Sequence, residues 1–301
     1  MARAHGKVIL LGEHAVVYGV PAIAASIDRG AQASARSAEV AELRIGDRRA
    51  VVGDGSELAR ALAALLAALG APALAFDVEL ALPPGAGLGA SAAMGVAIAR
   101  AALERMGRAD ELASVLAAAA AWEGIYHGNP SGIDAAAAAG TGCVWFEKGE
   151  SPKPIELAHE LTLAIGIAGP PASTKSMVDS VAALRERRRA VVDKAFEGIA
   201  ALVKNARLCL MAGDLRGLGE LMNYNQMLLS GLFVSTEGIE RCVALAREAG
   251  ALGAKLTGAG GGGAVVALAD DEPEPILRAW RAADIDCFAC RVPSARAAES
   301  S

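Results

Sequence analysis

The sequence has few aromatic residues and no apolar run long enough to cross a membrane. Aromatic residues make up 4% of the 301 positions, against a hydrophobic share of 53%, so we expect cores of alanine, valine, leucine and isoleucine. The longest apolar stretch, residues 58–76, contains Arg60, Gly70 and Pro72, which predicts a helix followed by a strand. The composition indicates a compact globular protein, and the length predicts two domains.

The sequence also lacks an excess of positive charge and an even number of cysteines. The formal net charge is -5, which leaves no broad basic field for nucleic acid. The basic run 185–189 is interpreted as a solvated helix face, with attraction of an anionic substrate as the alternative. Five cysteines are an odd number and do not describe a disulfide-stapled secreted domain, while the alternation over residues 285–292 indicates a strand instead of a zinc site. Because residues 12–14 interrupt the first apolar segment too early for a signal peptide, we expect a cytoplasmic protein with no membrane partner.

Two common phosphate-binding motifs are missing. No G-x-x-x-x-G-K-[ST] string occurs, and the glycine-dense segment 82–93 lacks the spacing of a dinucleotide fingerprint. Glycines in this segment can adopt positive φ, and the helix that follows offers unpaired N–H groups at its positive end. The segment predicts a loop that binds an ATP-like polyphosphate; the alternative is a loop that only turns a strand into a helix. The candidate nucleotide-binding residues are Pro84, Gly85, Ala86, Gly87, Leu88, Gly89, Ala90 and Ser91.

A second glycine-rich segment spans residues 255–263. Five of the six positions from 258 to 263 are glycine, and such a segment loses much backbone entropy when it folds. A plain hairpin needs no such composition, whereas a backbone packed against a phosphate site does. The segment therefore favours a functional loop over an ordinary turn.

Candidate acid–base residues lie between the two loops. Glu123 and His127 are four residues apart, hence on one face of a helix, and Asp134 follows a Pro-Ser-Gly turn. Because Mg²⁺ takes one or two carboxylates together with hydroxyl, water and phosphate oxygens, Glu123 and Ser91 form a sensible metal-binding pair, which leaves Asp134 as the base. The ammonium of Lys7 is suited to pair with Asp134. The alternatives are a solvated charge for Glu123, a structural histidine for His127 and a surface charge for Lys7.

Hydrophobic periodicity predicts an α+β chain. A charged, proline-bearing segment, residues 147–154, is the expected linker, which divides the chain into domains 1–154 and 155–301. The predicted strands are 8–11, 21–27, 40–45, 49–52, 74–82, 141–146, 161–168, 264–269 and 286–292, with one more before the second glycine loop. The predicted helices are 57–69, 91–106, 111–126, 236–249 and 273–283, with several between 176 and 229.

Four separated blocks of the chain resemble the GHMP small-molecule kinase superfamily. They are residues 7–22, 83–93, 127–134 and 255–263. The resemblance implies an N-terminal nucleotide-binding domain like ribosomal protein S5 and a ferredoxin-like C-terminal domain, with ATP and substrate in the cleft between them. The family commonly has two successive serines where this chain has Ala90 and then Ser91, so one hydroxyl is missing.

Residues 12–17 combined with 127–132 are most similar to the branch of this superfamily that acts on mevalonate. The resemblance implies transfer of the ATP γ-phosphoryl group to the C5 hydroxyl of (R)-mevalonate, in isoprenoid synthesis. The sequence leaves the oligomeric state open, with a homodimer among the alternatives. The rival hypotheses are a related kinase for phosphomevalonate or a mevalonate-like acid, and a non-catalytic metabolite sensor. The implied roles are base for Asp134, its electrostatic partner for Lys7, magnesium binding for Ser91 and Glu123, and substrate binding for Glu13, His14, Ser173, Thr174, Thr257, Gly258, Ala259 and Gly260.

Overall fold

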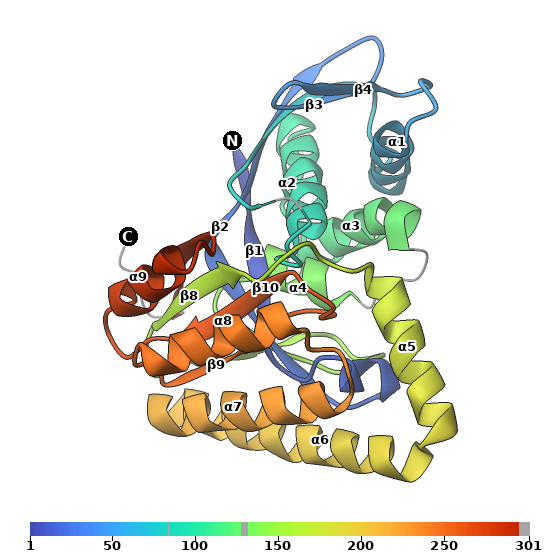
Figure 1. The fold of residues 1–301 in the computed structure, drawn as a ribbon. Helices are drawn as coiled ribbons and strands as arrows, with labels where there is room; N and C mark the ends of the chain where they lie inside the picture. Colours follow the sequence, from blue (N-terminus) through green and yellow to red (C-terminus); the bar gives the residue numbers. More distant parts are fainter. Residues whose placement is uncertain (84, 128–131, 295–301) are drawn as a thin grey trace. The chain divides into compact units, whose positions relative to one another are not determined.

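The computed structural model describes residues 1–83, 85–127 and 132–294, and Figure 1 shows its helices and strands. The chain forms two compact units, and neither is one continuous stretch. The first unit is Met1–Lys7, Arg29–Pro84 and Gly89–Gly140, and the second is Val8–Asp28, Gly85–Leu88 and Thr141–Ser301. The domain limits expected at residues 154 and 155 divide the chain at a single point. Each compact unit instead consists of several separate segments of the chain. The expected limits stay a prediction.

The first unit combines a sheet with four helices. Its strands run in the order β4-β3-β5-β2, with β3 and β5 parallel and the other pairs antiparallel. Helix α1 begins after Ser56, whose side chain accepts a hydrogen bond from the Ala59 N–H, and it ends at Gly70 in the left-handed conformation. The bounds are β1 (Ala2–Leu11), β2 (Ala22–Ser37), β3 (Glu42–Ile45), β4 (Arg48–Val51), β5 (Leu74–Leu80), α1 (Glu57–Leu69), α2 (Ala90–Arg105), α3 (Leu112–His127) and α4 (Ile133–Ala139).

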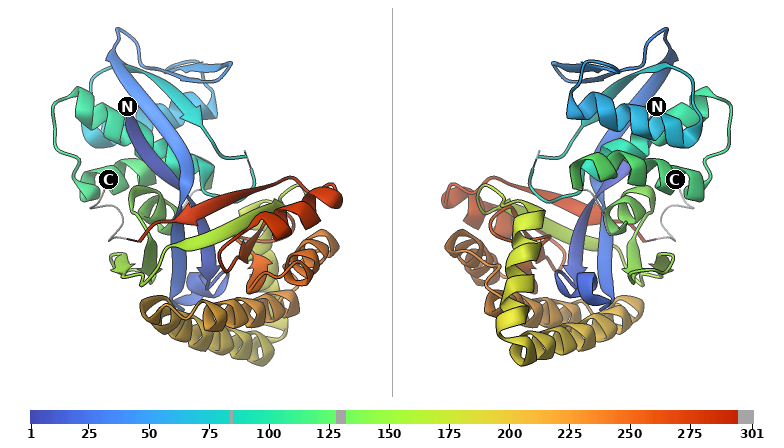
Figure 2. Two further views of the ribbon diagram at one scale, coloured as in Figure 1. Left: turned by 90° about the vertical axis from the view of Figure 1, so that its left-hand side faces the viewer. Right: turned by 90° about the vertical axis from the view of Figure 1, so that its right-hand side faces the viewer.

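The second unit contains a four-stranded antiparallel sheet in the order β11-β8-β10-β9. Helices α6 and α7 lie side by side in this unit, as both views of Figure 2 show. The first part of β2 pairs with β6, which in turn pairs with β7. The bounds are η1 (Ala15–Tyr18), β6 (Cys143–Phe146), β7 (Lys153–Ile155), β8 (Leu161–Ile167), α5 (Thr174–Arg187), α6 (Arg189–Ala212), α7 (Leu215–Gly231), α8 (Glu237–Glu248), β9 (Gly253–Leu256), β10 (Ala264–Leu268), α9 (Glu274–Ala282) and β11 (Cys287–Val292).

The α+β class is confirmed, and the structure differs from the predicted elements at four places. Strand β1 begins at Ala2 and β2 continues to Ser37, well past the predicted end at residue 27. The second half of β2 is rich in alanine and polar residues, which have low strand propensity, and it forms a strand because β5 pairs with it. Helix α4 and strand β7 were not predicted, and β7 begins inside the segment expected to be a linker.

Two further expectations concern membranes and cysteines. Over the described ranges, no helix combines the length and the apolar character needed to cross a membrane. All five cysteines are free thiols. The C-x-x-C pair lies in β11, as the alternation of its residues predicted.

Candidate active site

The first glycine loop has the backbone conformation that its composition predicted. Gly85, Gly87 and Gly89 have φ of 74°, 79° and 74°, values that side chains with a Cβ disfavour. Gly89 is the N-cap of α2, and neither a side-chain cap nor an acidic residue in the first turn satisfies the N–H groups there. These N–H groups and the helix dipole are therefore free to bind an anion. Pro84, also predicted to bind the nucleotide, lies outside the described residues.

An ion pair joins the two predicted catalytic residues in the first unit. Lys7 Nζ on β1 lies 3.0 Å from Asp134 Oδ1 in the first turn of α4. The lysine side chain is 4% exposed and the aspartate side chain 37%. The ammonium is therefore buried behind a carboxylate that a small molecule can reach.

The carboxylate of Glu123 belongs to the same cluster. Glu123 is buried on α3, and burial raises its pKa to about 8, with a further rise from the negative charge of Asp134 and an opposing effect of Lys7. A buried carboxyl with a neighbouring carboxylate is destabilised in its ionised form, so a bound cation would stabilise it. The side chain of His127, at the end of α3, lies outside the described residues.

Ser91 is the second predicted metal ligand, and it lies in the first turn of α2. Its hydroxyl oxygen accepts a hydrogen bond from Trp122 Nε1 at 3.2 Å, and Trp122 directly precedes Glu123 on α3. One carboxylate and one hydroxyl are few ligands, which suits Mg²⁺ because it keeps several waters and shares phosphate oxygens. No cluster of three or more His, Cys, Asp or Glu side chains that could hold a metal occurs in the part of the chain that the structure describes. The donor set fits Mg²⁺ bound together with a nucleotide better than a metal held by protein alone.

His14 lies in the second unit, where its backbone and side chain are both constrained. Its φ is 61°, which is uncommon for a residue other than glycine. Its Nε2 donates a hydrogen bond to the carbonyl of Ala259 in the second glycine loop, at 2.8 Å, and burial lowers its pKa, so the ring is neutral at pH 7. Because Nε2 carries the proton, Nδ1 is left as a hydrogen-bond acceptor.

Glu13 forms a buried ion pair with Lys255 of β9. Lys255 Nζ also contacts the carbonyl oxygens of Ile9 and Leu256, and Asn225 Nδ2 donates to Glu13 Oε2 at 3.1 Å. Burial raises the pKa of Glu13, while the charge of Lys255 opposes the rise. This network joins β1, the segment between β1 and η1, α7 and β9 inside the second unit, and it fixes the residue that precedes His14.

The second glycine loop is closely packed on both sides. A Cβ at Gly260 would lie 2.2 Å from the carbonyl oxygen of Val234, and one at Gly262 would lie 2.0 Å from that of Pro170. Only glycine fits such approaches. The loop also lies near the first glycine loop, since a Cβ at Gly263 would be 3.3 Å from the carbonyl oxygen of Ala86, which supports the predicted packing against a phosphate site.

The remaining predicted substrate residues differ in what their side chains already do. Thr257 Oγ1 accepts a hydrogen bond from Ile9 N–H and donates one to Ile9 O, at 2.8 and 3.2 Å, so this hydroxyl anchors the loop to β1. Ser173 is the N-cap of α5 and accepts from the Ser176 N–H, while Thr174 begins that helix and is exposed. Gly258 has a φ of 87°.

Sequence reasoning did not identify Lys255, Asn225 and Gln226 as site residues. All three are buried polar side chains. The two amides occupy the face of α7 that also carries buried Leu218, Met222 and Leu229. For these two amides, the available signal was a polar residue at an apolar position of the helical pattern, because buried polar groups need partners.

Comparison with known proteins first defines the class. Residues 56–142 match the GHMP kinases N terminal domain, and residues 199–286 match the GHMP kinases C terminal domain. Members of this family are enzymes that transfer a phosphoryl group from ATP to a small molecule, so the nucleotide expected from the first glycine loop is ATP.

The chain belongs to the mevalonate kinase family within the GHMP kinases. It is 33% identical to the mevalonate kinase of Thermococcus sibiricus, over 94% of this chain and 93% of that protein. It is 34% identical to the mevalonate kinase of Thermococcus gammatolerans, over 93% and 92%. Among solved structures, the complex of L. major mevalonate kinase with R-mevalonate matches with a TM-score of 0.89 and 32% identity, covering 97% of this chain and 95% of that one.

Proposed function

We propose that this protein transfers the γ-phosphoryl group of ATP to the C5 hydroxyl of (R)-mevalonate and gives 5-phosphomevalonate. The observation that carries the proposal is the ion pair of Lys7 with the accessible carboxylate of Asp134. A carboxylate that a substrate can reach is suited to accept the proton of an alcohol, and the buried ammonium beside it fixes the carboxylate in place and offers positive charge to the attacking oxygen. The identity to mevalonate kinases over nearly the whole chain supports mevalonate as the acceptor.

Asp134 acts as the general base and Lys7 as its electrostatic partner. The carboxylate accepts the proton of the C5 hydroxyl, and the ammonium stabilises the developing negative charge on the attacking oxygen. The ion pair also fixes the direction in which the carboxylate points, so the hydroxyl binds in a reactive orientation. Most of the acceleration comes from this positioning and from charge stabilisation, as in other phosphoryl transfers.

The first glycine loop and the start of α2 bind the phosphates of ATP. Backbone N–H groups from Gly85 to Ser91, together with the positive end of α2, hold the anionic oxygens. Glu123 and Ser91 are proposed to bind Mg²⁺, which when present neutralises charge on the β- and γ-phosphates. Burial of Glu123 keeps its carboxylate away from bulk water, so it binds a cation more strongly than an exposed side chain would.

The acceptor contacts residues of the first block and of the second glycine loop. His14 Nδ1 accepts a hydrogen bond from a hydroxyl group of the substrate that receives the phosphoryl group. The buried pair of Glu13 with Lys255 holds His14 in place. The mevalonate carboxylate and hydroxyls bind the N–H groups at the start of α5, with Ser173 and Thr174, and the N–H groups of residues 258–260. Thr257 supports this loop through its bonds to Ile9 and Ala264. Residues 1–154 would then form the nucleotide-binding domain, and residues 155–301 the C-terminal domain.

The variant Asp134→Asn tests the proposal. It keeps the shape of the side chain and removes the base, so we expect turnover to fall by at least about 10³-fold while ATP binds as before. Turnover is measured as ADP release with mevalonate, and ATP binding by calorimetry. Turnover within about tenfold of the wild type, a barrier change of only ~1.4 kcal/mol, would refute the base assignment. Phosphorylation of phosphomevalonate in preference to mevalonate would show that phosphomevalonate is the acceptor.

We also propose that the enzyme works in the cytoplasm, and we take a homodimer as the assembly to be tested. Five unpaired cysteines support a reducing compartment. Light scattering of the purified protein at several concentrations decides the assembly, since a mass of one chain at every concentration would contradict the dimer.

A further inference from the structure

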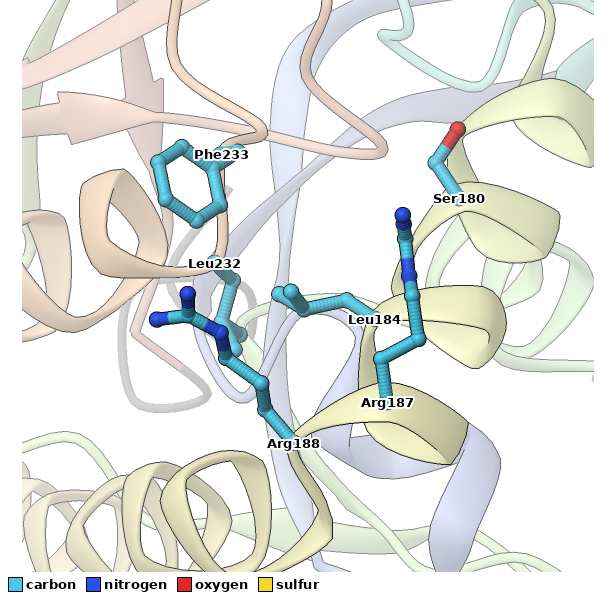
Figure 3. A pocket seen from close by; sticks show the side chains of 6 residues that line it. All are labelled: Ser180, Leu184, Arg187, Arg188, Leu232 and Phe233. Carbon is cyan, nitrogen blue, oxygen red and sulfur yellow. The ribbon is translucent and has the colours of Figure 1, made fainter.

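A cavity lies in the second unit, between the C-terminal half of α5 and the segment that follows α7, as Figure 3 shows. Its volume is about 480 Å³, within the range of small-molecule sites. None of the proposed catalytic, nucleotide or acceptor residues lines it. The lining side chains are Ser180, Leu184, Arg187, Arg188, Leu232 and Phe233.

The cavity takes its charge from the middle of the basic run 185–189. The outer arginines of the run share one carboxylate: Arg185 Nε lies 2.6 Å from Asp193 Oδ1, and Arg189 Nε lies 3.5 Å from Asp193 Oδ2. Arg187 and Arg188 form no ion pair with any residue that the structure describes. Two guanidinium groups without a carboxylate partner therefore face the same cavity.

The direction of the Arg187 side chain is fixed by its own helix. Its Nε donates a hydrogen bond to the carbonyl of Ala183 at 3.1 Å, which turns the side chain back along α5 toward Ser180 (Figure 3). This bond uses one of the five N–H donors of the guanidinium and leaves the terminal groups available. A planar group with free paired donors matches the oxygens of a phosphate.

Apart from Ser180, whose hydroxyl donates to the Ser176 carbonyl, the rest of the cavity is apolar. Leu232 and Leu184 form part of its lining, and Phe233 is 76% exposed with a φ of 61°. A left-handed conformation is unfavourable for a residue with a Cβ, and the ring gains little burial in return. An exposed aromatic side chain held beside unpaired guanidinium groups is suited to cover the apolar part of an anionic ligand.

We propose that this cavity binds a small phosphorylated molecule with an aliphatic chain. The phosphate group contacts the guanidinium groups of Arg187 and Arg188, and the chain lies against Leu184, Leu232 and Phe233. A phosphate carries up to two negative charges at pH 7 and several acceptor oxygens, so it matches two cationic side chains. The site is separate from the proposed phosphoryl transfer, and it can exist whether or not mevalonate is the acceptor.

Calorimetric titration with hexyl phosphate tests the site. Saturating ATP is present, so that the first glycine loop is occupied, and inorganic phosphate and 1-hexanol are titrated separately. We expect hexyl phosphate to bind at one site at least tenfold more tightly than either fragment. Failure of hexyl phosphate to bind, or equal affinity for inorganic phosphate or 1-hexanol, would overturn the proposal.

Variants of the lining residues assign the binding to this cavity. The double variant R187Q/R188Q is expected to weaken hexyl phosphate at least tenfold, and Phe233→Gly about tenfold, because glycine removes the ring and accepts the left-handed backbone. The control R216Q/R241Q removes two charges from exposed positions of α7 and α8 and is expected to bind within about twofold of the wild type. Circular dichroism verifies the fold of each variant. Unchanged binding by R187Q/R188Q, or an equal loss in the control, would place the ligand elsewhere.

Discussion

Gly89 permits the Lys7 side chain to reach Asp134, and an alanine at this position should separate them. Gly89 has a φ of 74°, and a Cβ built on it would lie 2.6 Å from Lys7 Cγ and 3.4 Å from Lys7 Cε. The Cγ atom cannot swing aside easily, because the side chain is buried and its Nζ is held by Asp134. The substitution therefore acts on the proposed catalytic pair without removing either of its members.

The size of the effect follows from these distances. Carbon atoms pack at ~3.5–4.0 Å, so Lys7 must move by about 1 Å to accommodate the new methyl group. A displacement of about 1 Å at a catalytic group lowers turnover by about 10²-fold. The left-handed backbone costs alanine about 1–2 kcal/mol of stability, and the overpacking adds about 1–3 kcal/mol.

Gly107→Ala is the matched control. Gly107 has a φ of 66°, and no atom of a described residue other than its immediate chain neighbours lies within 4 Å of the position its Cβ would take, so the control carries the backbone cost without the clash. We expect Gly89→Ala to lower kcat by about 100-fold and Gly107→Ala to leave it within about twofold. The assay measures ADP release at saturating ATP, with KM for ATP determined separately and stability measured by urea unfolding. If kcat of Gly89→Ala stays within about threefold of the wild type, Lys7 either does not move or does not assist Asp134.

Two further predictions concern buried charges. Because the pKa of Glu123 is about 8 in the folded protein and 4.5 is its ordinary value, the unfolded chain loses this proton first as pH rises, so the metal-free fold loses stability between pH 4.5 and 8. Glu123→Gln should therefore be more stable than the wild type in EDTA, by up to about 3 kcal/mol at pH 7 and by little at pH 4.5, and should need more Mg²⁺ for activity; an unchanged metal titration would contradict its role as a ligand. Lys255→Met should lower the free energy of unfolding by about 3–5 kcal/mol, because it leaves Glu13 buried without its partner, whereas Lys255→Met combined with Glu13→Gln should recover much of the loss in urea unfolding. Additive losses in the double variant would show that the two residues are not coupled.

The first glycine loop shows how far local composition can be interpreted. Three glycines in alternate positions before an alanine-rich helix predicted positive φ, and the structure confirms it at Gly85, Gly87 and Gly89. These conformations depend on the residues themselves, since glycine lacks a Cβ. The steric dependence of Lys7 on Gly89 could not be predicted, because the two residues are distant in sequence and meet only after folding.

The sequence alone determined the α+β class, most helix and strand positions and the candidate residues for phosphoryl transfer, because hydrophobic periodicity, caps and glycine conformations are local properties. The tertiary structure determined which side chains form ion pairs and hydrogen bonds with one another. It buried Lys7 behind Asp134, joined Glu13 to Lys255 and Asn225, and left Arg187 and Arg188 without an ion pair to any residue of the described ranges. These contacts depend on long-range packing and on the desolvation that packing produces. The spacing of residues along the chain therefore does not predict them.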